Sequence, residues 1–583
     1  MKQATIFFFL LLSGASCNEP AAMGPAEIIT PTSPPPTAAP PTPQPPSRPA
    51  PPSRPAPPSP WSCTETDYPV YPLTVESYTT LQRVWSPLKP STLVKAKITT
   101  RLLKVTELEK YQENGLGVEE QPGLPWIEHR ELAPEFEVGP DATRRSLAWF
   151  WQAADPQMID EESPIRFEAF SQLFRPQGHL IPQVFNAQVQ TIRRLSDQSD
   201  RPLEFAILAG DLTDGSQRNE LQWVLDILNG GIIDPDSGVD DDPIPGPAND
   251  YNDPFCAEGF PIPWYPAIGN HETLYNGGFG TITEAIRSAS IGGSLYEDSP
   301  FPNGFRDGST PNGDVVSEGN TPPDPRRLVL RLHEILEAIL EADGSPIGHG
   351  LTQENIEAGI GYYSTHPVPG KPIRLVTLKT VNPDALLGLG HQGYLDTIQF
   401  DWLQNELAQA DANRELVIVL SHHGSEEIGF TSPVSGEDLQ GALLQCEGLV
   451  LHLMGHGHQN EKHLVRSEQG GYWELMLAST VDFPMQSRLV EFVDEGNGFL
   501  TVYITNVGHN SPQGSLAHKA RELSAGKITF LRLIRGDVDD YWEKNSAAQN
   551  LVLRLPLSEE LQVHLREFTW PSVIESETTL QNL

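Results

Sequence analysis

The sequence predicts an α/β fold in which helices cover a sheet, and three observations carry this prediction. Apolar runs typical of buried strands recur from residue 147 onward, and each ends in a loop rich in glycine or histidine. Amphipathic segments with apolar residues three and four apart separate these runs, for example at 217–228 and 395–410. Alternation of strands with helices is typical of α/β domains. The runs are FAILAGD (205–211), WYPAIGNHE (264–272), IRLVTLKT (373–380), ELVIVLSHH (415–423) and LVLHLMGHGH (449–458).

Three later apolar runs predict an antiparallel part of the same domain. They follow one another without clear helices between them, at 472–480, 488–493 and 499–507. Strands that are joined by short connections pair in antiparallel fashion, because a parallel pair needs a long crossover. We therefore expect a mixed sheet arrangement toward the end of the domain.

Changes in composition divide the chain into segments. Residues 284–350 are rich in Gly, Pro, Ser and Asp, so we expect an insertion there, with one helix within 326–342. No role is assigned to the mixed pattern that precedes the main domain. The predicted segments are a signal peptide (1–16), a possible lipidated cysteine with a proline-rich linker (17–62), an N-terminal segment (63–146), the main domain (147–510) and a C-terminal extension that packs on the core (511–583).

The N-terminus has the layout of a secretory signal peptide. MKQATIFFFLLLSGASC contains one lysine, an apolar run too short to span a bilayer, and small residues that end at Cys17. It resembles a bacterial lipoprotein signal, in which Cys17 carries lipid, although Gly14 stands where that motif usually has Leu, Val or Ile. We expect an exported lipoprotein anchored at the outer membrane or cell surface. A secreted or periplasmic protein is the alternative.

The proline-rich segment that follows, with the repeat PPSRPAPPSRPAPPSP, predicts an extended polyproline II stalk. Such a stalk would hold the globular body away from the lipid at roughly 3.1 Å per residue. A tail without a function is the alternative. The sequence alone does not decide between them.

Charge limits the partners of this protein. Asp and Glu outnumber Lys and Arg, 77 to 39, so the formal net charge is −38. Such a protein repels polyanions, and we expect no nucleic-acid binding. A small phosphorylated substrate can still bind if bound metal ions make the local potential positive. The acidic loop 234–254 could hold calcium through its oxygens, or it could simply be solvated.

The cysteines do not suggest a metal site. Cys63, Cys256 and Cys446 form no CxxC pattern, which disfavours a zinc ribbon. If Cys17 carries lipid, the other three permit at most one disulfide. The sequence does not indicate which pair would join.

Five predicted strands end in side chains that bind metals. Each motif alone is weak evidence for a metal site, and Asp-Pro at 155–156 could be an ordinary turn. However, ligands of α/β proteins bind outside the carboxyl ends of the strands, where all five motifs lie. Their common placement and their carboxylate, amide and imidazole groups indicate one site. The motifs are Asp155-Pro156-Gln157, Gly210-Asp211-Leu212-Thr213-Asp214, Gly269-Asn270-His271-Glu272, His422-His423 and Gly455-His456-Gly457-His458.

These motifs resemble those of the calcineurin-like metallophosphoesterases, which run D-x-H, G-D-x-x-D, G-N-H-[DE], H and G-H-x-H in this order. The resemblance covers about residues 155–460 and includes the helix-like segment 393–407. It implies a four-layer αββα sandwich and a metal-dependent hydrolase of phosphate esters, either a phosphatase or a phosphodiesterase. GDLTD has no Tyr, so the purple acid phosphatases within this family are not matched.

The resemblance also implies two divalent metal ions (Mn, Zn, Fe or Mg) and a set of ligands. A carboxylate with two oxygens can bridge two cations, and Asp211 is the candidate bridge. His422 is preferred over its neighbour His423, because the family's ligand directly follows the strand. One ion would be bound by Asp155, Gln157, Asp211 and His458, and the other by Asp211, Asn270, His422 and His456.

Gln157 departs from the family pattern, which has His at this position. A neutral amide oxygen can bind a hard cation, but it is a poorer ligand than imidazole for zinc or iron. The departure leaves the site in place and makes its first metal the weaker one. Metal identity stays open.

His271 follows a predicted ligand and would point at the substrate. An imidazolium there could stabilise the transferred phosphoryl group or protonate the leaving oxygen. By resemblance, Asp214 would orient His271, and a metal-bound hydroxide would attack phosphorus. For Glu272, a capping role explains the residue as well as a catalytic one. Two alternatives to an enzyme remain, namely a surface lipoprotein that binds metal or phosphate without turnover and a surface adhesin on a stalk.

Overall fold

The computed structural model describes residues 77–88, 108–113, 115–165, 175–238, 242, 244–247, 249–278, 280–292, 322–382, 390–468, 470–535, 546 and 549–573. The predicted signal peptide, Cys17 and the proline-rich segment lie outside the described residues. A large part of the predicted insertion 284–350 also lies outside them. Among the described helices, none is both long and apolar enough to cross a membrane.

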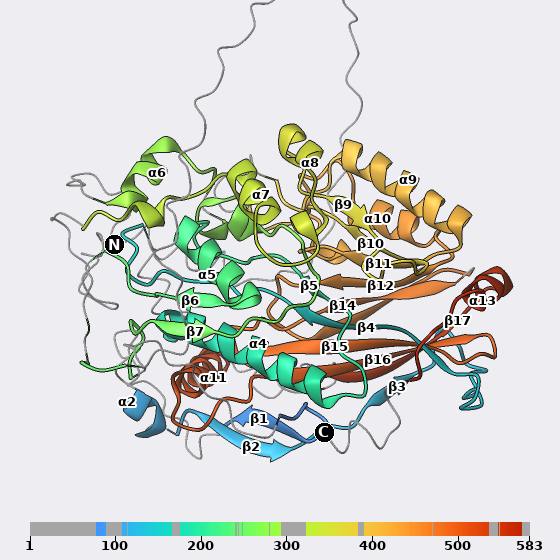
Figure 1. Cartoon of the computed structure of the whole chain (residues 1–583), viewed down its shortest axis with the longest axis horizontal. Coiled ribbons are helices and arrows are strands. Elements are labelled where there is room, and N and C mark those ends of the chain that lie inside the picture. The colour runs from blue at the N-terminus through green and yellow to red at the C-terminus, as the bar shows by residue number, and fades with distance from the viewer. Residues whose placement is uncertain are drawn as a thin grey trace, which may run out of the picture. The chain divides into compact units, whose positions relative to one another are not determined.

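Two sheets form the centre of the fold (Figure 1). In the first sheet β4, β5 and β8 are parallel, and β15, β16 and β17 are antiparallel. Its order is β3 (Ile127–His129), β17 (Asn550–Pro556), β16 (Phe499–Gly508), β15 (Gln486–Asp494), β4 (Arg145–Ala153), β5 (Phe205–Leu208) and β8 (Trp264–Pro266).

The second sheet is parallel at its centre and antiparallel at both edges. Strands β10, β11, β12 and β14 run parallel, whereas β9 and β13 are antiparallel to their neighbours. Its order is β13 (Glu461–Arg466), β14 (Gly471–Met476), β12 (Leu449–Met454), β11 (Leu416–Leu420), β10 (Ile373–Thr377) and β9 (Tyr363–Thr365). Of the three runs predicted to be antiparallel, 488–493 and 499–507 form the antiparallel pair β15 and β16 of the first sheet. The run 472–480 contains β14, which lies in the second sheet and runs parallel to β12, so the prediction is wrong for this strand.

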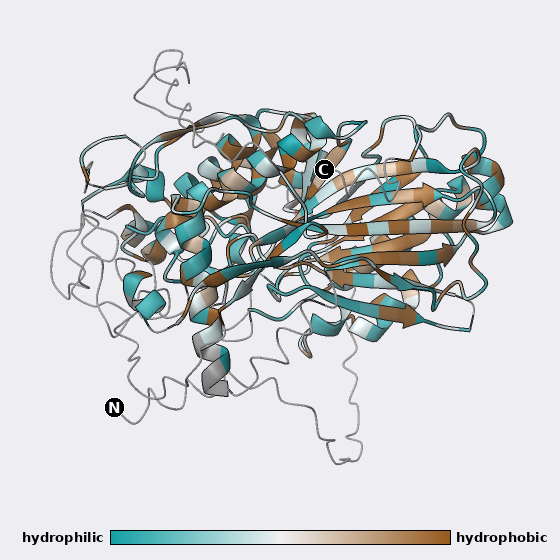
Figure 2. Ribbon diagram, turned by 90° about the horizontal axis from the view of Figure 1, so that it is seen from below, coloured by the Kyte–Doolittle hydropathy of each residue, from teal (hydrophilic) through white to brown (hydrophobic). Residues whose placement is uncertain are grey.

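The alternation of side chains along β11 shows how the layers pack. Leu416, Ile418 and Leu420 face a core shared with the first sheet. Val417 and Val419 face the other way, toward a second core. Because successive side chains of a strand point to opposite faces, both faces of this sheet are buried. Figure 2 shows the apolar residues concentrated along the strands.

Helices close the outer face of each sheet. The helices α9 (Thr397–Asn413) and α10 (Gly436–Leu443) pack on the second sheet through Leu403, Leu407 and Leu439. The helices α4 (Ile181–Gln198) and α5 (Arg218–Asn229) pack on the first sheet, and α11 (Leu516–Arg535) packs against α4. The order helix, sheet, sheet, helix confirms the predicted four-layer α/β class.

Local sequence signals explain where the helices begin and end. The Asp396 carboxylate accepts the Gln399 N–H at the start of α9, and Arg414 closes that helix in a left-handed conformation. Pro182 stands in the first turn of α4, where its missing N–H costs nothing. The smaller elements are β1 (Arg83–Pro87), α2 (Leu108–Glu113), β2 (Val118–Pro122), β6 (Gly231–Ile233), β7 (Phe255–Ala257), α6 (Glu284–Ile291), α7 (Leu332–Leu340), α8 (Gln353–Ala358) and α13 (Glu559–Leu565).

Segments outside residues 147–510 take part in the core. Strand β17 pairs with β16 over its full length, and β3 continues the sheet beyond β17. The ribbon of β1 and β2 contacts α11, and α11 contributes Leu516, Ala520 and Leu523 to a buried cluster with α4. Cys256 in β7 is disulfide-bonded, whereas Cys446 is a buried free thiol whose pKa is raised by burial.

Candidate metal centre

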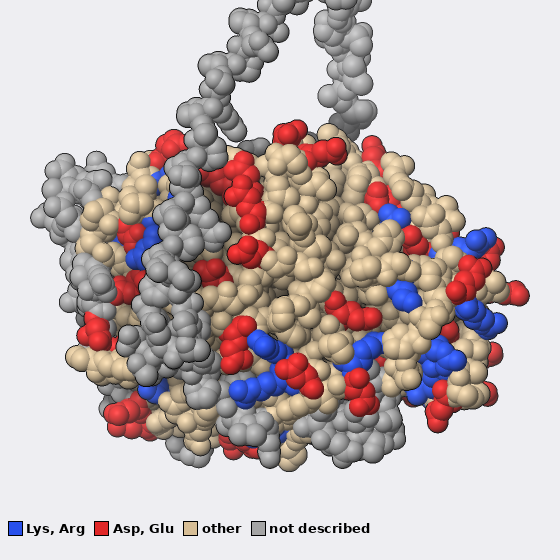
Figure 3. All heavy atoms as spheres, in the orientation of Figure 1, with Lys and Arg blue, Asp and Glu red and all other residues tan. Residues whose placement is uncertain are grey.

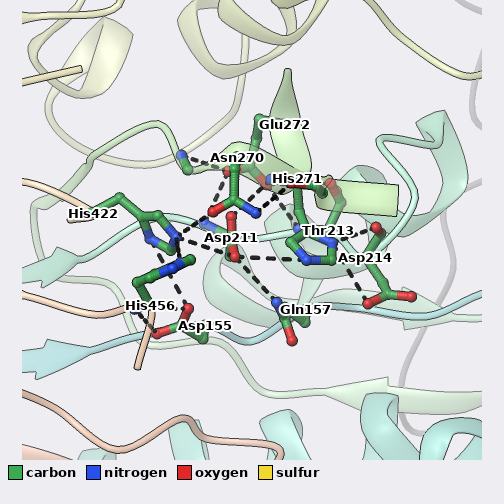
Figure 4. A network of polar contacts seen from close by, with 12 residues as sticks. Asp155, Gln157, Asp211, Thr213, Asp214, Asn270, His271, Glu272, His422 and His456 are labelled. Atoms are coloured by element: carbon green, nitrogen blue, oxygen red, sulfur yellow. Dashed lines mark hydrogen bonds and ion pairs between the residues drawn. The ribbon is translucent and has the colours of Figure 1, made fainter. Parts of the chain in front are cut away.

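The five sequence motifs meet where the parallel strands of the two sheets end. Asp155, Asp211 and Asn270 follow β4, β5 and β8 of the first sheet, and His422 and His456 follow β11 and β12 of the second. The His422 Nδ1–H donates to the Ala209 carbonyl (2.8 Å), which joins the two groups of loops. In Figure 4 the labelled side chains surround Asp211. The carboxyl edges of both sheets therefore contribute to one centre.

The backbone is unusual at these positions. Non-glycine residues rarely adopt a positive φ, and each such residue costs on the order of 1–3 kcal/mol, which the surrounding structure must offset. Such strain clusters at functional sites. Five of the predicted ligands have this conformation, namely Asp155 (50°), Gln157 (34°), Asp211 (51°), His456 (66°) and His458 (55°).

Asp155, Asp211 and His422 form the buried floor of the centre. Their side chains are at most 1% exposed, and one possible ligand atom from each lies within 4.8 Å of the other two. The His422 Nε2 is 3.2 Å from Asp211 Oδ2. Burial lowers the pKa of His422, but the Asp211 charge outweighs it and raises this pKa to about 10. Burial raises the pKa of Asp211, but His422 and His271 hold it well below its usual range. A metal ion at this point competes with protons.

The amide of Asn270 directs its oxygen toward this floor. Its Nδ2 donates to the Gly277 carbonyl (2.8 Å), which leaves Oδ1 facing His422 Nε2 at 2.9 Å. Because the other ring nitrogen of His422 donates to Ala209, Nε2 carries the lone pair of the neutral ring. The Nε2 lone pair therefore faces two oxygens, Asn270 Oδ1 and Asp211 Oδ2. These three atoms repel one another unless a proton or a cation lies between them, and a metal ion fits this position.

The amide of Gln157 is arranged differently. Its Nε2 donates to Asp211 Oδ2 (3.1 Å), and its Oε1 is buried without a hydrogen-bond partner. A buried, unpartnered carbonyl oxygen costs roughly 1–3 kcal/mol. Rotation of the amide by 180° would direct Oε1 toward Asp211, and a cation between the two oxygens would make that orientation favourable. The side chain thus lies where the sequence predicts a ligand, with its nitrogen toward the centre.

The histidines of the last motif occupy two sides of the centre. The backbone N–H of His456 donates to both Asp155 oxygens, and its Nδ1 lies 3.2 Å from His422 Nε2. His458 places Nε2 3.4 Å from Asp155 Oδ1 and donates from Nδ1 to Asp482 (2.8 Å). Burial lowers the pKa of His458, but the two carboxylates raise it to about 9.

His423, which the sequence places beside the preferred ligand, also approaches the centre. It forms a possible metal group with His422 and His456, and its Nε2 is buried without a hydrogen-bond partner. Its Nδ1 lies 3.1 Å from the Thr380 hydroxyl. The geometry therefore leaves both His422 and His423 as possible ligands, with His422 closer to Asp211.

His271 lies at the accessible side of the centre. Its side chain is 17% exposed, and its Nε2 is 3.9 Å from Asp211 Oδ2. Its Nδ1 lies 2.6 Å from the main-chain carbonyl of Asp214, which can only accept, so Nδ1 carries a proton. The Asp214 carboxylate is farther away, at 3.6 Å, and accepts from Arg175 at 2.7 Å. Asp214 thus contacts His271 mainly through its main chain.

Glu272 connects the loop that follows β8 with the loop that follows β5. It is fully buried and accepts the backbone N–H groups of Gly269, Asp211 and Thr213. Burial, with the Asp211 charge, raises its pKa to about 7. These contacts agree with the capping role that the sequence suggested.

Two residues of the site have no place in the predicted motifs. Asp482 accepts from His458, and Arg175 donates to both Asp482 and Asp214. Asp482 follows the apolar run that contains β14, so the same strand-end pattern could have indicated it. Arg175 has no signal in the sequence, because only the folded chain brings it to these carboxylates.

The acidic loop considered for calcium also brings carboxylates together. Possible ligand atoms of Asp242, Asp250 and Asp253 lie within 4.8 Å of one another. All three carboxylates already accept backbone N–H groups of their own loop. Calcium binding and simple solvation both stay open for this loop.

Comparison with known proteins identifies the family. The calcineurin-like phosphoesterase family matches residues 149–460, which is more than half of the chain. The chain belongs to this family. It is accordingly a metallophosphoesterase, and the family implies a centre of two divalent metal ions. The donor set described above, with two buried carboxylates, an amide oxygen and imidazole nitrogens, fits such ions.

The solved structures that match this chain are distant from it in sequence. A dimetal phosphatase from Danio rerio shares 12% identity over 62% of this chain and 99% of its own, with a TM-score of 0.34. The Thermus thermophilus sulfate thiohydrolase SoxB, in complex with glycerol, shares 11% identity over 69% of this chain and 62% of its own, with a TM-score of 0.25. No curated protein matches the sequence.

Proposed function

We propose that this metallophosphoesterase hydrolyses phosphate esters of small molecules at a binuclear centre bound by the seven predicted ligands. The convergence of Asp155, Asp211 and His422 within 4.8 Å, with the Asn270 oxygen directed at the same point, carries the proposal. Asp211 would be the ligand shared by both ions, because its carboxylate faces Gln157 of one predicted half-site and His422 of the other. The ligands are Asp155, Gln157, Asp211, Asn270, His422, His456 and His458.

Each residue has a separate task in this proposal. Two bound divalent cations would polarise the phosphoryl oxygens and lower the pKa of water. The residues of the chain orient these ions, exclude bulk water from the floor and supply a proton. The Nδ1–H of His271 is held on the Asp214 carbonyl, which turns Nε2 toward the centre. In its imidazolium form, His271 would donate the Nε2 proton to the leaving oxygen.

The surface supports a small substrate. Acidic side chains are spread over the described face shown in Figure 3, and basic side chains lie among them in its lower part. The net charge of −38 repels polyanions, whereas bound metal ions would attract one phosphate group locally. Monoesters and diesters both satisfy this requirement, and the experiment below separates them.

A substrate panel tests the proposal. The purified protein would be treated with chelator, reloaded with Mn, Zn, Mg or Fe, and tested on phosphate monoesters and diesters with aryl and alkyl leaving groups. We expect hydrolysis that requires added metal and stops again with chelator. Two bound ions per chain without turnover of any ester would favour the non-catalytic lipoprotein instead.

His271→Asn separates proton donation from metal binding. We expect kcat to fall by about 10²–10⁴-fold for alkyl esters, the range for loss of a general acid. The loss should be smaller for aryl esters, whose leaving group needs less protonation, and metal content should stay unchanged. An equal loss for both ester types would argue against His271 as the acid.

We also propose that the protein is exported and lipid-anchored through Cys17. The disulfide at Cys256 supports export, because disulfides persist in oxidising compartments. Cys17→Ser should move active protein from the membrane fraction to the soluble fraction. An unchanged distribution would contradict the anchor.

A further inference from the structure

The carboxylate of Asp482 lies between the predicted metal ligand His458 and two basic side chains, Arg175 and Lys527. Its Oδ2 accepts from His458 Nδ1 at 2.8 Å and from Arg175 Nε at 3.2 Å. Its Oδ1 accepts from Gln177 Nε2 at 3.0 Å and lies 3.7 Å from Lys527 Nζ. Four side chains thus hold one carboxylate in a single orientation.

Histidine ligands of metals usually donate their second N–H to a carboxylate or carbonyl, which fixes the ring and raises its basicity. Loss of such a partner typically costs 10–100-fold in metal affinity or activity. The His458–Asp482 contact has this geometry. His422 has the corresponding partner in the Ala209 carbonyl, so each of these two rings is supported by an acceptor.

Arg175 extends the support to the other side of the centre. Its Nη1 donates to Asp214 Oδ1 at 2.7 Å while its Nε contacts Asp482. The main-chain carbonyl of Asp214 in turn holds Nδ1 of His271. One guanidinium therefore connects the residues that hold His458 and His271. A lysine could not replace it, because an ammonium is a point charge without the fixed fork of the guanidinium.

The C-terminal helix α11 completes the network. Lys527 and Ser524 lie one turn apart on this helix, and the Ser524 hydroxyl lies 3.2 Å from Gln177 Nε2 and accepts the Phe483 N–H. Asp482, Ser524 and Lys527 all lie beyond residue 460, where the family match ends. Neither the family nor the predicted motifs assign a role to them.

We infer that Asp482 and Arg175 are positioning residues of the reaction. Asp482, held by Arg175, Gln177 and Lys527, orients His458 toward the first metal, and Arg175 links this ligand to the Asp214–His271 pair. The inference rests on the proposed function, because it requires that His458 binds metal. It adds that α11 is part of the site.

Metal binding, measured by calorimetry and by metal analysis after dialysis, tests the inference together with kcat and KM. Asp482→Asn should lower the affinity for one of the two ions by about 10–100-fold. Arg175→Lys should weaken the same ion less than Asp482→Asn does, because Asp482 keeps Gln177 and Lys527. It should also lower kcat about tenfold and leave KM nearly unchanged, because it disturbs His271.

Glu495→Gln is the matched control. Glu495 is also fully buried and pairs with Arg144 at 2.9 Å, but it follows the far end of β15, roughly 30 Å from Asp482 at about 3.3 Å per strand residue. It should change stability without changing metal affinity. Unfolding temperatures in chelator would show that each variant folds. If Asp482→Asn does not fold, Lys527→Met keeps the carboxylate and should lower the affinity about threefold, less than loss of the partner itself.

Several outcomes would overturn the inference. Wild-type affinity for both ions in Asp482→Asn, with hydrolysis intact, would remove Asp482 from the site and leave the proposed function standing. An equal loss of affinity in Glu495→Gln would show a general effect of stability. If the unmodified protein bound no metal, the proposed function and the inference would both fail.

Discussion

The two predicted halves of the metal centre use the same kinds of side chain but hold them differently. In the half with Asn270 and His422, the amide nitrogen is bonded to the Gly277 carbonyl, so the oxygen faces the ligands. In the half with Gln157 and His458, the amide nitrogen faces Asp211 and the oxygen has no partner. His422 is fully buried, whereas the His458 side chain is 19% exposed.

The half with Asn270 is therefore preorganised for a metal ion, whereas the half with Gln157 must rearrange to bind one. A ligand that neighbouring groups already orient loses little conformational entropy when it binds a metal. A Gln side chain that must rotate and give up a hydrogen bond loses more. We therefore expect the half with Asn270 to bind its ion more tightly than the half with Gln157. The following predictions test this difference, from the largest effect to the smallest.

Asp211→Asn should affect both halves and give the largest loss. The change removes one negative charge from between two cations, so both ions lose a ligand of full charge. We expect kcat/KM to fall by more than about 100-fold, the upper end of the range for residues that only support a metal ligand. Metal content after dialysis should fall in parallel. The same change at the exposed capping residue Asp438 is the control, and an unchanged metal content would refute the bridge.

Asn270→Ala and Gln157→Ala compare the two halves directly. We expect the Asn270 variant to lose about 100-fold in metal affinity and the Gln157 variant about tenfold, the two ends of the range for residues around a metal. Calorimetric titration of chelated protein measures both. Equal losses would mean that the orientation of the amide in the folded chain does not matter for binding.

Gly277→Ala tests the groups that orient the tighter half. Gly277 has a φ of +70°, and a Cβ there would lie 2.2 Å from His271 Nε2. The ring must move, so kcat should fall about tenfold, within the range for misplaced supporting residues. Gly359→Ala is the control, because it has a φ of +67° and no atom within 4 Å of its Cβ. Both should lose about 1 kcal/mol of stability, but only the first should lose activity.

Gln157→His should have the smallest effect and should strengthen the weaker half. Imidazole binds zinc and iron better than an amide oxygen, so affinity for these metals should rise relative to Mn and Mg. The new ring lacks a partner that fixes its tautomer, which limits the gain to about tenfold or less. Metal titration followed by dialysis measures it. Two tightly bound ions in the unmodified protein would show that Gln157 does not weaken the site.

Sequence patterns predicted the fold class and the location of the site. Buried parallel strands need apolar residues on both faces, and the helices that cover them need one apolar stripe. Both patterns depend only on nearby residues, so runs such as FAILAGD and the amphipathic segments between them predict the α/β class. Residues that follow the parallel strands of one sheet lie at one edge of that sheet. Asp155, Asp211 and Asn270, and separately His422 and His456, could therefore be grouped before their distances were known, whereas the packing of the two sheets brings the two groups together.

Only the tertiary structure decided how the site is oriented and supported. The rotation of the Gln157 amide depends on the Asp211 oxygen that faces it, more than fifty residues away in the sequence. The contacts of Arg175, Asp482 and Lys527 join distant segments, and no periodicity or spacing records which of them will meet. The sequence alone determines which groups a strand end presents, because that depends on neighbours along the chain. The partners of those groups depend on packing between elements, which exists only once the sheets and α11 have come together.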